Sequence, residues 1–195
     1  NLQIREGEMV CLLGGNASGK TTTLKTILGM VEPTSGEVVI DGLVTNGLPT
    51  AKVVERGVSM VPENRRLFKR MTVRENLEIG GYLRDDSLDE DFERIFELFP
   101  RVKERLGQRA GSLSGGERQR VGIARALAAD PDILLMDEPF GAIDPINRVV
   151  LQDTLLQIQE EIAKTIVIVT HDINEAIKLG DRIAIMDEGA LIQYD

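Results

Sequence analysis

"GGNASGKTT", residues 14–22, follows the apolar run "MVCLL" and decides the fold. Gly14 and Gly19 bracket four residues, and Lys20 and Thr21 follow, which is the spacing G-x-x-x-x-G-K-T. Such a bare backbone can curl so that its N–H groups point at phosphate oxygens, and the next helix N-terminus adds partial positive charge. Lys20 can reach β- and γ-phosphates, and the Thr21 hydroxyl can hold Mg²⁺. The stretch predicts a phosphate-binding loop rather than a glycine-rich turn with a chance lysine.

The composition is that of a globular chain with an acidic balance. Its 195 residues suffice for one domain with its own core, 42% of them are apolar, and the net charge is −9. This charge disfavours a large basic face for nucleic acid. The one cysteine, Cys11, excludes an internal disulfide, fits a reducing compartment, and is expected in the core. No apolar run reaches the roughly 18 residues of a bilayer span, and no signal-peptide pattern is present.

Short apolar runs alternate with helical patterns, which predicts an α/β fold with a mostly parallel sheet. The chain has no initiator methionine and stops at "LIQYD", so we expect both ends to be truncated. Between residues 72 and 129 the pattern indicates helices and no convincing strand, hence an inserted helical lobe. The expected strands lie within residues 8–14, 36–42, 57–63, 131–139, 164–172 and 181–189.

The clearest helix of the lobe is expected in "DSLDEDFERIFELFPRV", residues 86–102. Ser87 and Glu90 have the spacing of a capping box, and Pro100 is expected to end the helix. A second helix is expected from about residue 116 to 129, closed by Asp130-Pro131. The residues that share one apolar face of the first helix are Phe92, Ile95, Phe96 and Phe99.

An acidic pair and a histidine follow two further apolar runs. Asp137 and Glu138 come after "DILLM", and His171 comes after "TIVIVT". Ligands of a parallel sheet bind at the carboxyl ends of its strands, so Asp137 is placed to meet Mg²⁺ and Glu138 to accept a proton from water. The alternatives are a surface turn and a structural histidine. The upstream loop favours the functional interpretation of the acidic pair, whereas position alone leaves the role of His171 open.

"LSGGERQR", residues 113–120, places two glycines after a serine at a helix start, which makes a second anion-binding helix end. This stretch resembles the signature of the ATP-binding cassette (ABC) ATPases, and further motifs follow in that family's order over essentially the whole chain. Residues 14–22 match its Walker A loop, and Glu63 stands at its Q-loop. "GAID", with Ala142, resembles its D-loop, and His171 matches its switch histidine.

The resemblance implies roles for individual residues. Catalysis is assigned to Glu138, His171 and Lys20, and Mg²⁺ binding to Thr21, Glu63 and Asp137. The positions implied to contact ATP are Gly14, Gly15, Asn16, Ala17, Ser18, Gly19, Lys20, Thr21, Thr22, Ser114, Gly115, Gly116, Glu117 and Asp144.

The resemblance also implies an architecture and partners. It predicts a P-loop NTPase fold, with a RecA-like core at 1–71 and 130–195 and a helical subdomain at 72–129 that carries the signature. Two ATPase subunits, identical or different, would pair head to tail and bury ATP and Mg²⁺ between them. Integral membrane permease subunits would hold the pair at the cytoplasmic face of the membrane, although the isolated chain would be soluble. Nucleic acid is not among the expected partners.

Three features qualify the resemblance. Residues up to about Gln108 are similar to ATPases of branched-chain amino acid importers, whereas 120–148 and 170–186 are similar to those of glycine betaine, choline and proline importers. Glu63 replaces the usual glutamine and adds charge. The family's adenine-stacking aromatic residue would precede this sequence, and such stacking is worth roughly 1–3 kcal/mol in other base-binding proteins, so weaker adenine binding is expected.

The leading hypothesis is therefore an ATP-hydrolysing subunit of an importer of amino acids, with the branched-chain type favoured, or of quaternary amines. One alternative is a truncated or recombined module that binds ATP without efficient turnover. Another is an ABC ATPase that acts on chromosomes or ribosomes and has no role in transport. Chromosome types separate their motifs with long coiled coils, and no sustained heptads lie between Lys20 and Ser114.

Overall fold

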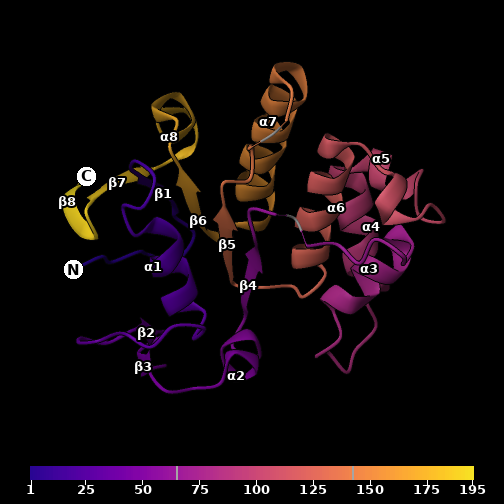
Figure 1. The fold of residues 1–195 in the computed structure, drawn as a ribbon. Coiled ribbons are helices and arrows are strands. Elements are labelled where there is room, and N and C mark those ends of the chain that lie inside the picture. The colour runs from indigo at the N-terminus through magenta and orange to yellow at the C-terminus, as the bar shows by residue number, and fades with distance from the viewer. Residues whose placement is uncertain (65, 142) are drawn as a thin grey trace.

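A mostly parallel sheet forms the centre of the computed structural model, which describes residues 1–64, 66–141 and 143–195 (Figure 1). Among these residues the main sheet has six strands in the order β4-β5-β6-β1-β7-β8, and all neighbours are parallel except β7 and β8. The predicted α/β class is thus confirmed. The strands are β1 (Met9–Leu13), β4 (Val58–Val61), β5 (Ile133–Asp137), β6 (Thr165–Thr170), β7 (Arg182–Asp187) and β8 (Ala190–Tyr194).

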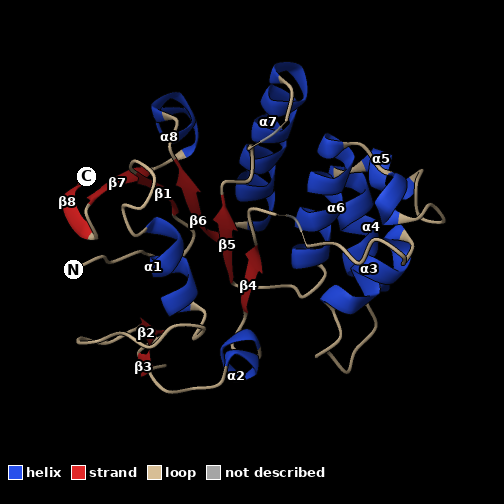
Figure 2. Ribbon diagram, in the orientation of Figure 1, coloured by secondary structure: helices blue, strands red, loops and turns tan. Residues whose placement is uncertain are grey.

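Helices cover both faces of this sheet (Figure 2), and the two cores that the residues of β1 join show which helices lie on each face. Met9 and Cys11 join a core with helices α6, α7 and α8, whereas Val10 and Leu12 join a second core with α1 and α2. Successive residues of a strand point to opposite faces, so a continuous apolar run is what a doubly covered strand requires. The helices outside the lobe are α1 (Lys20–Ile27), α2 (Thr50–Val54), α7 (Pro145–Ile162) and α8 (Ile173–Leu179).

Two tight turns create strands that the apolar pattern did not place. β2 (Val39–Ile40) lies within the segment expected as one strand at 36–42. It pairs antiparallel with β3 (Leu43–Val44), which follows that segment, and the two form a sheet of their own outside the main sheet. The turn between them has positive φ at Asp41 and Gly42, and the turn before β8 has positive φ at Glu188 and Gly189. Two successive residues of positive φ are typical of hairpin turns.

Residues 72–129 form a group of helices beside the sheet (Figure 1). As predicted, this segment contributes no strand of two or more residues among its described positions; an isolated bridge joins Thr72 to Arg109. The apolar face predicted for the first helix is buried at all four phenylalanine and isoleucine positions. The elements are α3 (Val73–Gly80), α4 (Asp89–Leu98), α5 (Pro100–Lys103), the 3₁₀ turn Ala110–Ser112 and α6 (Gly115–Leu127).

The predicted capping box of Ser87 and Glu90 is wrong. Leu88 is the N-cap of α4, and Ser87 Oγ instead accepts the N–H of Asp89 at 3.2 Å and donates to its carboxylate at 2.8 Å. The neighbouring aspartate competes for the serine and shifts the helix start by one residue. Pro100 also does more than end a helix, because it is the first residue of α5, where its fixed φ suits helix entry.

Cys11 offers a probe of folding. Its thiol is fully buried in β1, and burial, helped by the charges of Glu175 and Asp181, raises its pKa to about 12. Because the thiolate is the reactive form, we expect thiol reagents to modify the native chain only as fast as it unfolds, and denatured chain at once. Mass spectrometry of timed samples at mildly alkaline pH measures this; rapid modification of folded protein would contradict it.

In the described part of the chain, no helix combines the length and the apolar character that crossing a membrane requires.

Candidate phosphate-binding site

The loop between β1 and α1 turns sharply before the helix begins. Ala17 has φ 62° and Gly19, the N-cap of α1, has φ 94°. Ser18 N–H donates to Gly15 O at 3.3 Å, and Gly189 N–H donates to Ser18 O at 3.1 Å, so the β7–β8 turn supports the loop. No side chain of the described residues caps α1. Its first N–H groups therefore remain available to an anion.

Close packing, and not an unusual φ, requires glycine at position 14. A Cβ at this position would lie 2.3 Å from Met186 O and 2.6 Å from Ser18 Oγ, both closer than non-bonded atoms approach. At Gly15, no atom of the described residues lies within 4 Å of an added Cβ. The two adjacent glycines therefore have different roles: the first lets β7 approach the loop, and the second keeps the loop's outer side open.

This contrast predicts that Gly14→Ala lowers stability while Gly15→Ala leaves it nearly unchanged. The alanine at 14 must displace β7 or the loop, and overpacking of this kind costs roughly 1–3 kcal/mol. Denaturant unfolding of the two variants and the parent measures the difference, and Gly15→Ala controls for the lost glycine flexibility. Equal midpoints for the two variants would show that Met186 does not restrict the loop.

Lys20 lies folded back into the loop that precedes it. Its side chain is buried, and Nζ donates to Gly14 O at 2.8 Å, to Gly15 O at 2.6 Å and to Ser18 Oγ at 3.3 Å. These contacts use all three donors of the ammonium group. The positive charge thus sits in the hollow of the loop, where phosphate oxygens could replace the carbonyl and hydroxyl partners.

Thr21 and Asp137 meet although 116 residues separate them. Thr21 Oγ1 donates to Asp137 Oδ1 at 2.9 Å, and Asp137, the last residue of β5, is only 4% exposed. Burial raises the pKa of Asp137, and the hydrogen bond from Thr21 opposes that change. A hydroxyl and a carboxylate are ligands that Mg²⁺ takes in nucleotide sites, where phosphate oxygens and water complete its shell.

Glu63 does not join this pair in the structure. It lies exposed in the turn after β4, and it has no hydrogen bond or ion pair with any described residue. The described residues likewise contain no cluster of three or more acidic, histidine or cysteine side chains that could hold a metal unaided. A role of Glu63 at Mg²⁺ therefore stays a prediction.

Glu138 and His171 lie together at the carboxyl ends of β5 and β6. His171 Nδ1 is 3.2 Å from Glu138 Oε1, and the Glu138 N–H donates to Val169 O at 3.0 Å. Glu138 has φ 46°, a left-handed conformation that costs about 1 kcal/mol or more and is kept where the surroundings enforce it. The imidazole is 59% exposed and the carboxylate 21%. A carboxylate beside an imidazole at an open edge can activate a water molecule.

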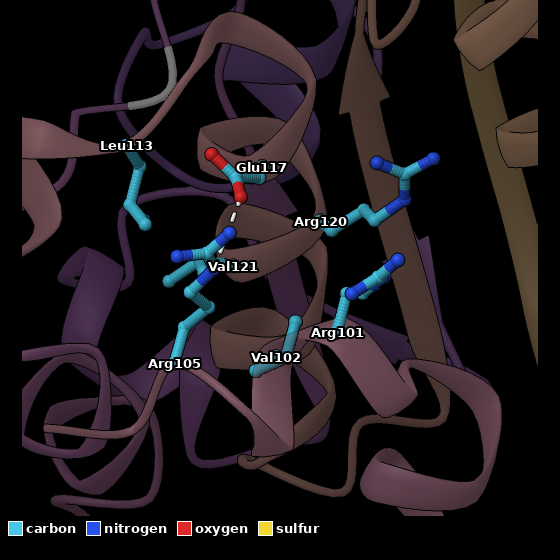
Figure 3. A pocket seen from close by; sticks show the side chains of 7 residues that line it. All are labelled: Arg101, Val102, Arg105, Leu113, Glu117, Arg120 and Val121. Atoms are coloured by element: carbon cyan, nitrogen blue, oxygen red, sulfur yellow. Dashed lines mark ion pairs between the residues drawn. The ribbon is translucent and has the colours of Figure 1, made fainter. Parts of the chain in front are cut away.

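The serine-glycine motif begins α6. Ser114 Oγ accepts the N–H of Glu117 at 3.3 Å, and Glu117 Oε2 accepts the N–H of Ser114 at 2.8 Å, which makes a capping box. That backbone hydrogen bond lowers the pKa of Glu117, and Arg105 pairs with the same carboxylate at 3.2 Å. Gly115 and Gly116 form the first turn. Figure 3 shows the small pocket beside it, lined by Arg101, Val102, Arg105, Leu113, Glu117, Arg120 and Val121.

Asp144 is the N-cap of α7. It accepts hydrogen bonds from Asn147 N at 3.1 Å and from Asn147 Nδ2 at 2.9 Å, which lower its pKa. Arg120 Nη2 donates to Asn147 Oδ1 at 2.9 Å and so joins the start of α7 to α6. Ala142, expected in the same loop, lies outside the described residues.

The predicted site residues therefore form two groups. Lys20, Thr21, Asp137, Glu138 and His171 gather at the carboxyl edge of the sheet, whereas Ser114 and its neighbours belong to the lobe. Figure 1 shows α1 and α6 on opposite sides of β4 and β5. Sequence reasoning missed the support that the β7–β8 turn gives the loop. The adjacent "DEG" of residues 187–189 signals a turn but not its place beside the loop.

This fold and this edge define a P-loop NTPase of the ABC cassette type. The chain belongs to the ABC transporter family: the profile described as "ABC transporter" matches residues 1–141. The osmoprotectant import ATP-binding protein OsmV of Salmonella typhimurium is 44% identical over 99% of the chain, and the chain spans about half, 51%, of its length. The high-affinity branched-chain amino acid transport ATP-binding protein BraG of Pseudomonas aeruginosa is 38% identical over the whole chain and 84% of its own length.

Solved structures give the same result. The dimeric post-hydrolysis state of the ATP-binding cassette MJ0796, bound to ADP and Pi, matches with a TM-score of 0.87 and 35% identity, over the whole chain and 88% of that structure. The recognition of an ABC ATPase from the signature and the phosphate loop is thus confirmed.

Proposed function

We propose that the chain binds and hydrolyses ATP as the motor subunit of an ABC importer. The observation that carries this proposal is the Thr21–Asp137 hydrogen bond at the mouth of the loop. It joins the uncapped start of α1, which suits a triphosphate, to the end of β5, where Glu138 follows. Family membership and the names of the relatives support the same function.

The chain's own groups would supply most of the chemistry as positioning and electrostatics. Lys20 and the loop N–H groups would bind the β- and γ-phosphates and stabilise the charge that develops there. Thr21 and Asp137 would hold Mg²⁺, which neutralises phosphate charge when bound. Glu138 would polarise the attacking water, and His171 would orient it beside the γ-phosphate.

A second copy or a related subunit would complete each site. Ser114, the two following glycines and Glu117 lie in the lobe, apart from the chain's own loop, so one chain would offer its phosphate loop to ATP and its partner would offer α6 and Asp144. The dimeric form of MJ0796 supports this arrangement. We keep the division into a RecA-like core, at 1–71 and 130–195, and a helical subdomain at 72–129 as part of the proposal.

The transported molecule would be an amino acid of the branched-chain type or a quaternary amine. BraG is named for branched-chain amino acids, and OsmV for osmoprotectants. The residues near the Q-loop, similar to branched-chain importers, favour the first. Permease subunits would hold the chain peripherally at the cytoplasmic face of the membrane.

Phosphate release from ATP by the purified chain tests the proposal. We expect release that saturates with ATP, depends on Mg²⁺ and stops on addition of EDTA. The matched control is Thr21→Val, which keeps the side-chain shape but lacks the hydroxyl and should release phosphate far more slowly. Binding of ATP without release would instead favour the non-hydrolysing module, and no binding at all would contradict both.

A further inference from the structure

Glu175 is a buried carboxylate that the phosphate site does not explain. It lies in the first turn of α8, is 7% exposed, and has its pKa raised by burial. Its Oε2 accepts a hydrogen bond of 2.5 Å from Thr170 Oγ1. Burying a carboxylate is costly unless partners compensate. Its partners therefore show what it holds in place.

The hydroxyl of Thr170 makes two hydrogen bonds. It donates its one proton to Glu175, and it accepts the N–H of Asp172 at 3.1 Å. These bonds tie together the residues on either side of His171. The imidazole itself is 59% exposed, so the surrounding core does not orient it. The direction in which it leaves the backbone depends on this turn.

Arg148 connects the same carboxylate to α7. Its Nε is buried, has no hydrogen-bond partner among the described residues, and lies 4.0 Å from Glu175 Oε1. This distance exceeds a hydrogen bond and leaves an electrostatic contact. Its Nη2 donates to Ile143 O at 3.4 Å, one residue before the N-cap Asp144. Glu175 thus touches both the turn of His171 and the start of α7.

We propose that Glu175 is a positioning residue for His171. Through Thr170 it holds the turn that carries the imidazole beside Glu138, and through Arg148 it ties that turn to the start of α7. The inference rests on the proposed function of His171 in ATP hydrolysis. Because the start of α7 is proposed to face the second subunit, docking of that subunit can influence the histidine by this path.

Two conservative variants test the proposal in the full chain. Glu175→Gln keeps the size but removes the charge that faces Arg148, and Thr170→Val keeps the shape but removes the hydroxyl. Both should lower kcat for ATP about tenfold or more while KM stays within about twofold. Thr170→Ser should restore the rate, and Glu160→Gln, exposed on α7, should match the parent. Parent-like kcat in both test variants would overturn the proposal.

A second measurement needs no turnover. His171 is the only histidine, so its imidazole resonances in an NMR spectrum are assigned without ambiguity. They should shift in Glu175→Gln and in Thr170→Val and stay in place in Glu160→Gln. In a His171→Ala background, Glu175→Gln should cause no further loss of rate. If the parent hydrolysed no ATP, the proposed function would fail, but the resonances would still test whether Glu175 positions His171. Unshifted resonances in both test variants would overturn the positioning role.

Discussion

Replacing Glu138 by glutamine is expected to lower the rate of ATP hydrolysis about a thousandfold, in the range found when a general base is removed. The amide keeps the size of the side chain and can still contact His171, 3.2 Å away in the parent, but it cannot take a proton from water. Nucleotide affinity should change little, because Lys20 and the loop N–H groups remain. Steady-state phosphate release and equilibrium ATP binding, measured on the same preparation, separate the two effects.

The matched control for this prediction is Glu97→Gln. Glu97 lies exposed on α4, far along the chain from the loop. The Glu97→Gln variant should therefore hydrolyse ATP at the parent rate. A Glu138→Gln chain with parent activity would show that another group activates the water. A joint loss of binding and turnover would show instead that the left-handed backbone at residue 138 fails to tolerate the change.

Replacing Lys20 by alanine should reduce ATP affinity about a hundredfold, because charge-assisted hydrogen bonds to phosphate are roughly twice as strong as neutral ones and several are lost together. In the structure Nζ already holds the carbonyls of Gly14 and Gly15. The variant therefore loses both the phosphate ligand and the group that shapes the loop before ATP arrives. Titration with a fluorescent ATP analogue gives the affinity.

Lys25→Ala is the control, because it removes the same charge from the last turn of the same helix. Its affinity should stay within a few-fold of the parent. Thermal unfolding without nucleotide should accompany both titrations, since it separates a misfolded loop from a folded loop without its cation. Unchanged affinity in a folded Lys20→Ala chain would remove the lysine from the site.

The fold could be predicted from the sequence wherever the local residue pattern agrees with the place that the segment takes in the sheet. The run "MVCLL" and the G-x-x-x-x-G-K-T spacing specify a strand, a turn and a helix, because a doubly covered strand needs apolar residues throughout and the loop needs glycine. The edge position of Asp137 follows from the same rule for parallel strands. The capping box at Ser87 failed because Asp89 offers the serine a nearer partner. Local competition of this kind is decided by geometry that spacing does not contain.

The site was less predictable than the fold, because its contacts join distant segments. That Thr21 donates to Asp137, and that His171 lies beside Glu138, depends on which strands are neighbours. The close approach of Met186 to Gly14 likewise depends on β7 lying next to β1. Thr170 reads in sequence as one more β-branched strand residue, and nothing there shows that its hydroxyl supports the histidine turn.

The most direct test of the central claim is to measure the oligomeric state of the Glu138→Gln variant by sedimentation, with and without Mg·ATP. We predict a monomer without nucleotide and a dimer at saturating Mg·ATP, and we expect the additional substitution Lys20→Ala to restore the monomer. A folded Glu138→Gln chain that binds Mg·ATP and remains a monomer would contradict the claim that a second subunit completes the site.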